Sequence, residues 1–344
     1  MLCIKIYRKE MYLKMKQSYY LYKSGRLQRK DNTLEIVYKD NTKKSIPVER
    51  VDDIYVMTEF DFNTNLLNFL SQFGINIHFF NYYGFYTGTY YPKESLVSGK
   101  LLIKQVEYYN DKEKRLNIAK AFIEAASYNI YRNLTYYNNR GKDLKEYMKE
   151  IDFFRKKIKL CKDVSELMGI EGNIRKVYYD SWNIIINQDI AFEKRVKNPP
   201  DNAINSLISY INTIIYTRVL SEIYKTQLNP TISYLHEPSE RRFSLCLDIA
   251  EIFKPIIADR LIFSMLNKRQ ITEKDFEDGL NFTYIKDNAR KNITREIDLR
   301  LQTKIKHKKL DREVSYEYLI RLEVYKLIKH LLEDEEYESF KMWW

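Results

Sequence analysis

Cysteine is scarce in this chain of 344 residues. Its three cysteines, Cys3, Cys161 and Cys246, lie far apart, and none belongs to a CxxC pair. A disulfide framework is built from an even set of cysteines, and a structural zinc site needs closely spaced ligands, so neither is expected. We therefore expect a protein of a reducing compartment.

Long apolar runs are missing as well. No segment approaches the roughly 18 consecutive apolar residues that identify a membrane-spanning helix. No signal peptide with a basic and then an apolar region opens the sequence. We expect a cytoplasmic protein that has no membrane partner.

Acidic residues are outnumbered by basic ones. The chain has 58 Lys and Arg against 47 Asp and Glu, which gives a net charge of +11. This surplus favours a polyanionic partner such as nucleic acid, although a composition rich in Lys, Asn, Ile and Tyr also arises from AT-rich coding. The 44% of hydrophobic residues excludes a disordered chain.

Glycine becomes rare after the first hundred residues, and the hydrophobic pattern changes there. Residues 19–91 alternate in the manner of strands between turn signals, whereas residues 101–344 show the 3.6-residue period of helices. The sequence predicts an α+β protein. A small, mostly β domain at 1–91 is followed by a linker at 92–100 and a larger α-helical domain at 101–344.

Three local signals refine this prediction. Gly74 follows a helical segment of the first domain and is expected to end it. Pro199 and Pro200 are expected to stop one helix of the second domain. Asp201 or Asn202 then provides the cap of the next helix.

The segment SLCLDIAEIF, residues 244–253, predicts a buried helix that carries two acids. Asp248 and Glu251 share one face, and apolar residues occupy the other directions. Buried carboxylates need a basic partner, a shared proton or a bound cation to compensate for lost hydration. Three basic residues are near enough in sequence to act as partners: Arg241, Arg242 and Lys254.

Histidine is also rare, and one of the four lies just before this helix. His236 is in a proline-bounded loop, where its imidazole can join the carboxylates in a metal site or form an ordinary hydrogen bond. Glu171 lies between Gly169 and Gly172 at the expected start of another helix, four residues before Arg175. It is either a helix-capping partner of that arginine or a third metal ligand.

Several segments, taken in order, resemble a known family. They are LMGIEGNIRKVYY, RVKNPPDNAINSLISYINTIIY and NPTISYLHEPSERRFSLCLDIAEIFKP, preceded by YYLYKSGRLQRKDNTLEIVYKD, NLLNFLSQFGINIHFFNYYGFYTGTYYP and SGKLLIKQVEYY. The series is similar to that of the CRISPR-associated integrase, the metal-dependent DNA endonuclease of the spacer-acquisition complex. The resemblance spans about residues 18 to 330, and the ordered run of motifs is far more specific than any single motif.

The resemblance implies a site and a fold. The fold is a β-rich amino-terminal domain followed by a helical catalytic domain with one metal site, filled by Mg²⁺ or Mn²⁺. Carried over by position, the catalytic residues and metal ligands are Glu171, His236 and Glu251, with Asp248 as an auxiliary neighbour. Lys254 departs from the arginine that many members have, so bidentate phosphate binding is lost there.

The resemblance also implies a reaction and its partners. A DNA 3′-hydroxyl attacks a phosphodiester at the edge of a CRISPR repeat, which requires no protein nucleophile. Expected partners are protospacer DNA, the repeat, a second copy of the chain and a small ferredoxin-like subunit. The first domain, with its hairpin NYYGFYTGTYY, is expected to form the dimer surface, unless those rings fill its core. Four basic residues are expected either to contact DNA phosphates or to form salt bridges that support the site: Arg175, Arg195, Arg242 and Lys254. The tyrosine pair Tyr178 and Tyr179 is expected to lie near the substrate.

Two other functions remain open from the residues. One is a catalytically silent DNA-binding protein in which the acids and His236 form a buried ion-pair network. The other is a metal-dependent nuclease of a defence system that acts on RNA.

Overall fold

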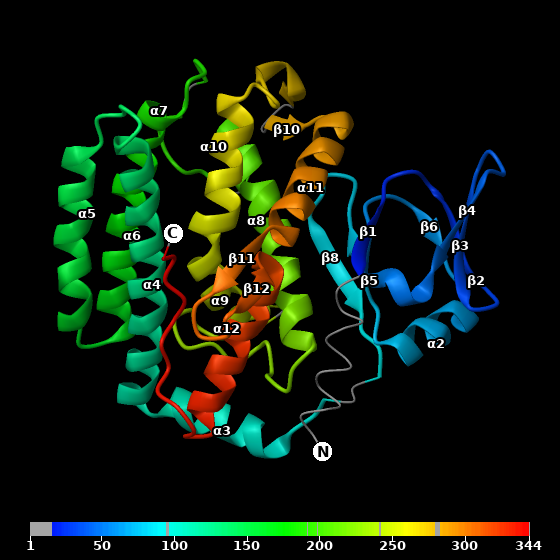
Figure 1. Ribbon diagram of the computed structural model, residues 1–344, viewed down its shortest axis with the longest axis horizontal. Helices are drawn as coiled ribbons and strands as arrows, with labels where there is room; N and C mark the ends of the chain where they lie inside the picture. The colour runs from blue at the N-terminus through cyan, green and yellow to red at the C-terminus, as the bar shows by residue number, and fades with distance from the viewer. Residues whose placement is uncertain are drawn as a thin grey trace. The chain divides into compact units, whose positions relative to one another are not determined.

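The structure, a computed structural model, describes residues 16–93, 96–190, 192–197, 199–240, 242–278 and 283–343. The chain forms two compact units, Met1–Ser95 and Leu96–Trp344, with a boundary that falls within the predicted linker segment. Glu94 and Ser95 of that segment lie outside the described residues. The first unit is rich in strands and the second in helices (Figure 1), so the predicted α+β class is confirmed.

Among its described residues, the amino-terminal unit has two four-stranded sheets. One has the strand order β1-β5-β7-β8, and the other has the order β4-β3-β2-β6. The strands are β1 (Gln17–Leu21), β2 (Gly25–Lys30), β3 (Thr33–Tyr38), β4 (Lys43–Pro47), β5 (Val51–Val56), β6 (Phe60–Asp61), β7 (Asn76–Phe80) and β8 (Tyr86–Tyr90), with a 3₁₀ turn η1 (Val48–Arg50).

The first strand belongs to a different sheet from the three that follow it. β1 pairs in parallel with β5, and β5 with β7, whereas β2, β3 and β4 form an antiparallel meander. The chain therefore crosses between sheets just before Gly25. A Cβ atom at Gly25 would lie 2.5 Å from the carbonyl oxygen of Val37, so only glycine lets β2 and β3 approach this closely.

Helix α2 (Thr64–Phe73) contributes to the core of the amino-terminal unit. Asn63 caps its start, because its Oδ1 accepts a hydrogen bond from the backbone nitrogen of Leu66 at 2.9 Å. Gly74 ends it with a left-handed φ of 64°, as predicted. Leu66 and Leu70 are fully buried among apolar residues of both sheets.

The second unit is mostly helical. Its described helices are α3 (Gly99–Asn110), α4 (Lys112–Asn138), α5 (Lys145–Lys157), α6 (Val164–Asp180), α7 (Trp182–Ile185), α8 (Ala203–Tyr224), α9 (Ser244–Lys254), α10 (Arg260–Asn267), α11 (Asp287–Gln302) and α12 (Tyr316–Leu331). Shorter elements are η2 (Ile158–Leu160), the π-helical turn η3 (Pro255–Asp259), η4 (Glu273–Asp275) and two ribbons, β9 (Phe276–Asp278) with β10 (Thr283–Ile285) and β11 (Lys304–His307) with β12 (Arg312–Ser315).

Helix α9 lies in the interior of the helical unit, where α4 and α8 both pack against it (Figure 1). All but two of its 11 residues are buried, which confirms the buried helix predicted at this segment. None of the helices among the described residues is both long and apolar enough to span a membrane. Cys161 and Cys246 are buried free thiols, and Cys3 lies outside the described residues.

The expectation that Pro199 and Pro200 stop a helix is wrong. No helix occurs between α7 and α8 among the residues that the structure describes there. The side chain of Asn205, in α8, bonds to backbone groups of this loop and holds it in a non-helical path. Asn202 caps α8, as predicted, because its Oδ1 accepts from the backbone nitrogen of Asn205 at 2.9 Å.

Replacing Gly74 with alanine should destabilise the amino-terminal unit by about 1 kcal/mol, because alanine disfavours a left-handed φ. Urea unfolding followed by circular dichroism measures the change. Gly99→Ala is the matched control, since that glycine opens α3 without a positive φ and has open space around its Cβ position. Equal stability of the two variants would contradict the assigned role of Gly74.

Candidate functional site

Helix α6 carries the first acid of the predicted site. Asp163 caps the helix by accepting from the backbone nitrogen of Glu166 at 2.8 Å, so α6 begins before the segment in which its start was expected. Glu171 therefore lies in the middle of α6 and cannot act as a helix cap. The prediction that it caps the start of this helix is wrong. One turn later, the Nε of Arg175 donates to Glu171 Oε1 at 3.2 Å. The expected i,i+4 pair is present.

Helix α9 carries the second acid, and α6 reaches it through Arg175. The guanidinium donates from Nη2 to Glu251 Oε2, and the ammonium of Lys254 donates to Glu251 Oε1 at 2.5 Å. Burial raises the pKa of Glu251, but Lys254 and Arg175 outweigh burial and hold that pKa well below its usual range. Basic partners thus compensate this buried carboxylate. Of the other candidates, Arg242 is exposed and Arg241 lies outside the described residues.

Asp248 is fully buried, and its carboxylate organises the loop that carries His236. Oδ2 accepts from the backbone nitrogens of Tyr234 at 2.7 Å and Leu235 at 2.9 Å. Oδ1 accepts from the backbone nitrogen of His236 at 3.0 Å and lies 2.8 Å from its Nδ1. Because Nδ1 is engaged, Nε2 is the ring nitrogen that can serve as a metal ligand.

The end of α9 is anchored to α4 by two buried asparagines. Asn129 Nδ2 donates to the carbonyl oxygen of Ile252 at 3.0 Å, and Asn133 Nδ2 donates to that of Pro255 at 2.7 Å. At this point α9 continues into η3, where proline removes a backbone donor and the hydrogen-bond pattern changes. The asparagines satisfy carbonyl groups in the segment that follows Glu251. The sequence signal that could have predicted these hydrogen bonds is a pair of asparagines four residues apart in an apolar helical stretch.

The acids of α6 and α9 face a cleft of about 480 Å³. Tyr179, Arg195 and Lys197 lie on its wall together with the acids and their partners. The full set of lining residues is Glu171, Gly172, Arg175, Lys176, Tyr179, Asp180, Glu193, Lys194, Arg195, Lys197, Asn212, Glu251 and Lys254. The cleft therefore combines carboxylates with a larger number of cationic side chains, an arrangement suited to a phosphate ligand.

Two cationic residues of the cleft have unusual surroundings. Burial lowers the pKa of Lys197, and nearby Lys254 lowers it further. Burial also lowers the pKa of Arg195, whose guanidinium is held by Ser209 Oγ at 2.9 Å and Asn205 Oδ1 at 3.0 Å. Anionic ligands are favoured where cations are concentrated and partly desolvated.

The predicted substrate contacts separate into different places. Arg175, Arg195, Lys254 and Tyr179 line the cleft. Arg242 is exposed in the loop before α9 and is not among the lining residues. Tyr178 is fully buried and its hydroxyl lies 3.2 Å from Asn133 Nδ2, so it cannot stack on a nucleotide. Three lining lysines were missed, Lys176, Lys194 and Lys197, because only tertiary packing brings them beside the acids.

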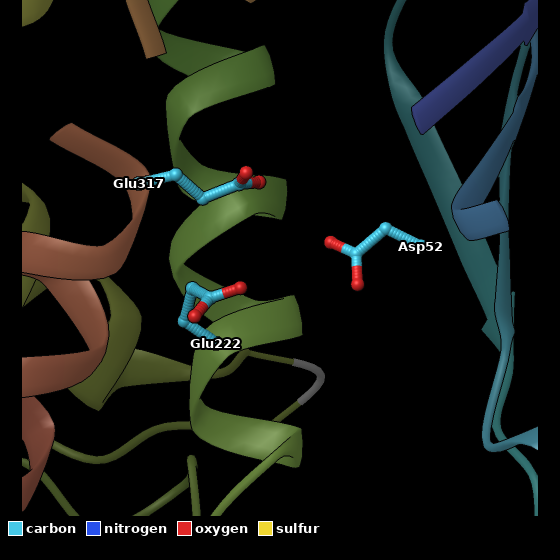
Figure 2. A group of neighbouring side chains, drawn as sticks. All are labelled: Asp52, Glu222 and Glu317. Atoms are coloured by element: carbon cyan, nitrogen blue, oxygen red, sulfur yellow. The ribbon is translucent and has the colours of Figure 1, made fainter. Parts of the chain in front are cut away.

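Another pair of acids lies elsewhere in the helical unit (Figure 2). Glu222 of α8 and Glu317 of α12 have carboxylate oxygens within 4.8 Å of each other. Each has an arginine partner, at 2.6 Å from Arg321 Nε to Glu222 Oε2 and at 3.1 Å from Arg218 Nη1 to Glu317 Oε1. Asp52, also drawn, belongs to the amino-terminal unit and is not counted with this pair. The two glutamates are therefore neutralised by arginine.

Arg175 joins two of the three predicted metal ligands, Glu171 and Glu251. Among the residues that the structure describes, Glu171, His236 and Glu251 do not each bring a ligand atom within 4.8 Å of the other two. Arg175 instead bonds to both carboxylates. Two carboxylates and an imidazole whose second nitrogen is held by Asp248 nevertheless form a donor set that fits Mg²⁺ or Mn²⁺.

Comparison with known proteins identifies the family of this chain. The sequence model of the family described as CRISPR associated protein Cas1 matches residues 19–298. The chain belongs to the Cas1 family. A protein of Fusobacterium nucleatum subsp. nucleatum named CRISPR-associated endonuclease Cas1 is 62% identical over 330 residues, which are 96% of this chain and 98% of that protein.

Solved structures of the Cas1 fold are similar as well. The Cas1 protein TM1797 of Thermotoga maritima is 41% identical, with a TM-score of 0.83 over 94% of this chain and 100% of that one. A casposase bound to its integration product has the same fold, with a TM-score of 0.84 at 21% identity over 94% of this chain and 93% of that one.

Replacing Asp248 with asparagine should destabilise the protein by about 3 kcal/mol, because the amide NH₂ would face backbone N–H donors in a buried site. Urea unfolding measures this loss. Asp163→Asn is the control, since that carboxylate accepts from one amide at a helix start, where asparagine caps equally well. Equal stability of the two variants would show that Asp248 does not hold the loop.

Asp259, at the end of η3, predicts a dependence of stability on pH. Burial raises its pKa to about 7, although Arg175, Tyr178 and Lys254 act in the opposite direction. Its ordinary pKa is 3.8, so folding takes up a proton between about pH 4 and pH 7, and stability falls as pH rises through that range. Above pH 7 the buried charge costs about 4 kcal/mol.

Asp259→Asn should remove this cost. The variant should exceed the parent in Tm at pH 8 by several degrees, about 2 to 4 °C per kcal/mol, and by clearly less at pH 5. Thermal unfolding of both proteins at the two pH values gives the comparison, in which other titrating groups cancel. A difference in Tm that does not change with pH would contradict the raised pKa.

Proposed function

We propose that this chain is a metal-dependent DNA endonuclease and integrase that inserts short foreign DNA fragments into a CRISPR array. The observation that carries the proposal is the cleft between α6 and α9 in this member of the Cas1 family. There Glu171 and Glu251 lie beside a cationic wall, which is formed by Arg195, Lys197 and Lys254. In the integration step, a 3′-hydroxyl of the fragment attacks a repeat phosphodiester, bonds to its phosphorus and displaces the 3′-oxygen of the cut repeat strand, which leaves as a hydroxyl. Water as the attacking group gives strand cleavage at the same site.

Glu171, Glu251 and Nε2 of His236 would hold the metal, Mg²⁺ or Mn²⁺. When bound, the ion polarises the scissile phosphate and lowers the pKa of the attacking hydroxyl. Asp248 fixes the imidazole through Nδ1 and three backbone amides, so its lone pairs orient the site rather than bind the ion.

The cationic wall would hold the DNA backbone. Arg195 is fixed by its bonds to α8 and presents a rigid guanidinium, which suits bidentate phosphate contact. Lys197 and Lys254 add ammonium groups, and Tyr179 offers a ring at the same cleft for stacking on a base. Phosphate binding would relieve the repulsion between Lys197 and Lys254 that contributes to the lowered pKa of Lys197.

Integration at two ends of one fragment calls for a homodimer, bridged by the small ferredoxin-like subunit of the acquisition complex. The amino-terminal unit is the proposed dimer surface. At the turn between β7 and β8, Tyr82, Tyr83 and Phe85 are 69%, 52% and 43% exposed, so these rings are not buried in the core of their own unit. Exposed aromatic rings of this kind favour protein contacts. Because the proposed substrate is a CRISPR array, we expect the protein to act in the cytoplasm.

The ion pairs of the cleft favour a second candidate function, a catalytically silent DNA-binding protein. Arg175 and Lys254 already neutralise Glu171 and Glu251 without a metal. This candidate requires DNA binding without cleavage and no stabilisation by Mn²⁺ or Mg²⁺. Metal-dependent cleavage therefore separates the two functions.

The parent protein should cleave a branched DNA integration intermediate in the presence of Mn²⁺. His236→Ala and Glu251→Ala should each lower the cleavage rate about 100-fold or more, because each removes a metal ligand. Glu171→Ala should also abolish the rise in Tm that Mn²⁺ causes. Gel separation of the labelled strands measures the rates.

The control for these variants is His307→Ala, which removes a histidine of the β11–β12 ribbon and should leave cleavage unchanged. Cleavage by His236→Ala or Glu251→Ala at the parent rate would rule out the metal site. Faster cleavage of an RNA of the same sequence would identify an RNA-acting nuclease instead.

A further inference from the structure

Arg175 has a position that neither helix capping nor phosphate contact explains. Its Nε donates to Glu171 Oε1 at 3.2 Å, and its Nη2 donates to Glu251 Oε2. The guanidinium therefore bridges the two carboxylates of α6 and α9. Its side chain is only 12% exposed, and those of Glu171 and Glu251 are 23% and 10% exposed.

Opposite charges stabilise the bridge that Arg175 forms between Glu171 and Glu251. Burial lowers the pKa of Arg175, but Glu251, Tyr179 and Glu171 raise it well above its ordinary value, so the guanidinium stays charged. Two partly buried carboxylates repel each other unless a cation lies between them. Arginine supplies that cation through planar, directional donors that match carboxylate oxygens.

Lys254 completes the neutralisation of Glu251. Its ammonium donates to Oε1 while Arg175 donates to Oε2, so each carboxylate oxygen has one cationic partner. A cation that binds Glu251 must therefore displace or share at least one of these donors. Asp248 and His236 are not affected in the same way, because their contacts lie on the loop side of α9.

We propose that Arg175 is a built-in counter-ion, which holds the carboxylates of Glu171 and Glu251 together until a divalent metal replaces it. The inference rests on the proposed function, because it assigns those two acids to the metal. Metal binding is then an exchange of one cation for another. The displaced guanidinium stays at the cleft, where its fork of donors can bind a DNA phosphate.

Two consequences follow from such an exchange. The apparent affinity for the metal is reduced by the fraction of molecules in which Arg175 occupies the site. Metal and DNA binding are also coupled, because the metal frees a phosphate-binding group, and this coupling acts equally in both directions. Arg175 is thus a positioning residue in the metal-free protein and a phosphate contact in the loaded one.

The direct test is isothermal titration of Mn²⁺ into the full-length parent and Arg175→Gln, without DNA. If Arg175 fills the site in about nine-tenths of molecules, the variant should bind Mn²⁺ about tenfold more tightly. Arg175→Lys keeps the charge but not the forked donors of the guanidinium, so its Mn²⁺ affinity should lie between those of the parent and Arg175→Gln. It also takes the place of the glutamine variant in this test if that variant does not fold.

Arg290→Gln is the matched control. Its side chain is also 12% exposed and pairs with an acid, Asp287, but it lies in α11 outside the cleft lining. Its Mn²⁺ affinity should equal that of the parent. A second readout is DNA binding, measured by fluorescence anisotropy of a labelled branched DNA. Mn²⁺ should strengthen it in the parent, and Arg175→Gln should lose most of that gain.

The outcomes separate this inference from the function on which it rests. One outcome would overturn the counter-ion role alone. In it, the parent binds Mn²⁺, Glu171→Ala abolishes that binding, and both Arg175 variants bind Mn²⁺ with unchanged or weaker affinity. Absence of Mn²⁺ binding in the parent and in both variants would overturn the metal site and the counter-ion role together. Tighter binding by both variants with an unchanged control supports the exchange.

Discussion

The helical unit depends on one constraint, which is that two carboxylates on a buried helix must be compensated. On α9, Asp248 is satisfied by donors of the loop that carries His236, and Glu251 is satisfied by Arg175 and Lys254. The first set of bonds joins the loop to α9, and the bond from Arg175 joins α6 to α9. The relative positions of histidine and acids therefore result from the neutralisation of buried charge.

The surrounding helices keep this arrangement in place. Asn129 and Asn133 of α4 bond to carbonyl groups where α9 passes into η3, so the backbone is satisfied even though the helical pattern changes. The acids are carried by helices rather than by flexible loops, and this favours a defined geometry for a reaction at phosphate. His236 is on a loop, but the bonds to Asp248 give that loop comparable support.

Much of this could be predicted from sequence, and the errors have two different origins. The apolar surroundings of Asp248 and Glu251 predicted a buried helix, and Gly74 and Asn202 predicted helix ends, because each signal depends on residues close in the chain. The start of α6 was misplaced since Asp163 lies earlier than the glycines that suggested it. The burial of Tyr178 depends on α4, which is distant in sequence.

By itself, the sequence determined the order of a strand-rich and a helical part, the buried acidic helix and the motif series of the Cas1 family. Only the tertiary structure decided that Arg175 bridges Glu171 and Glu251, that Asp248 holds the loop of His236, and that Lys197 lies on the same cleft. The physical reason is the distance along the chain over which each interaction acts. Helical periodicity and capping act within a few residues, whereas an ion pair depends on the distance between charges, and packing alone sets that distance for residues far apart in the chain.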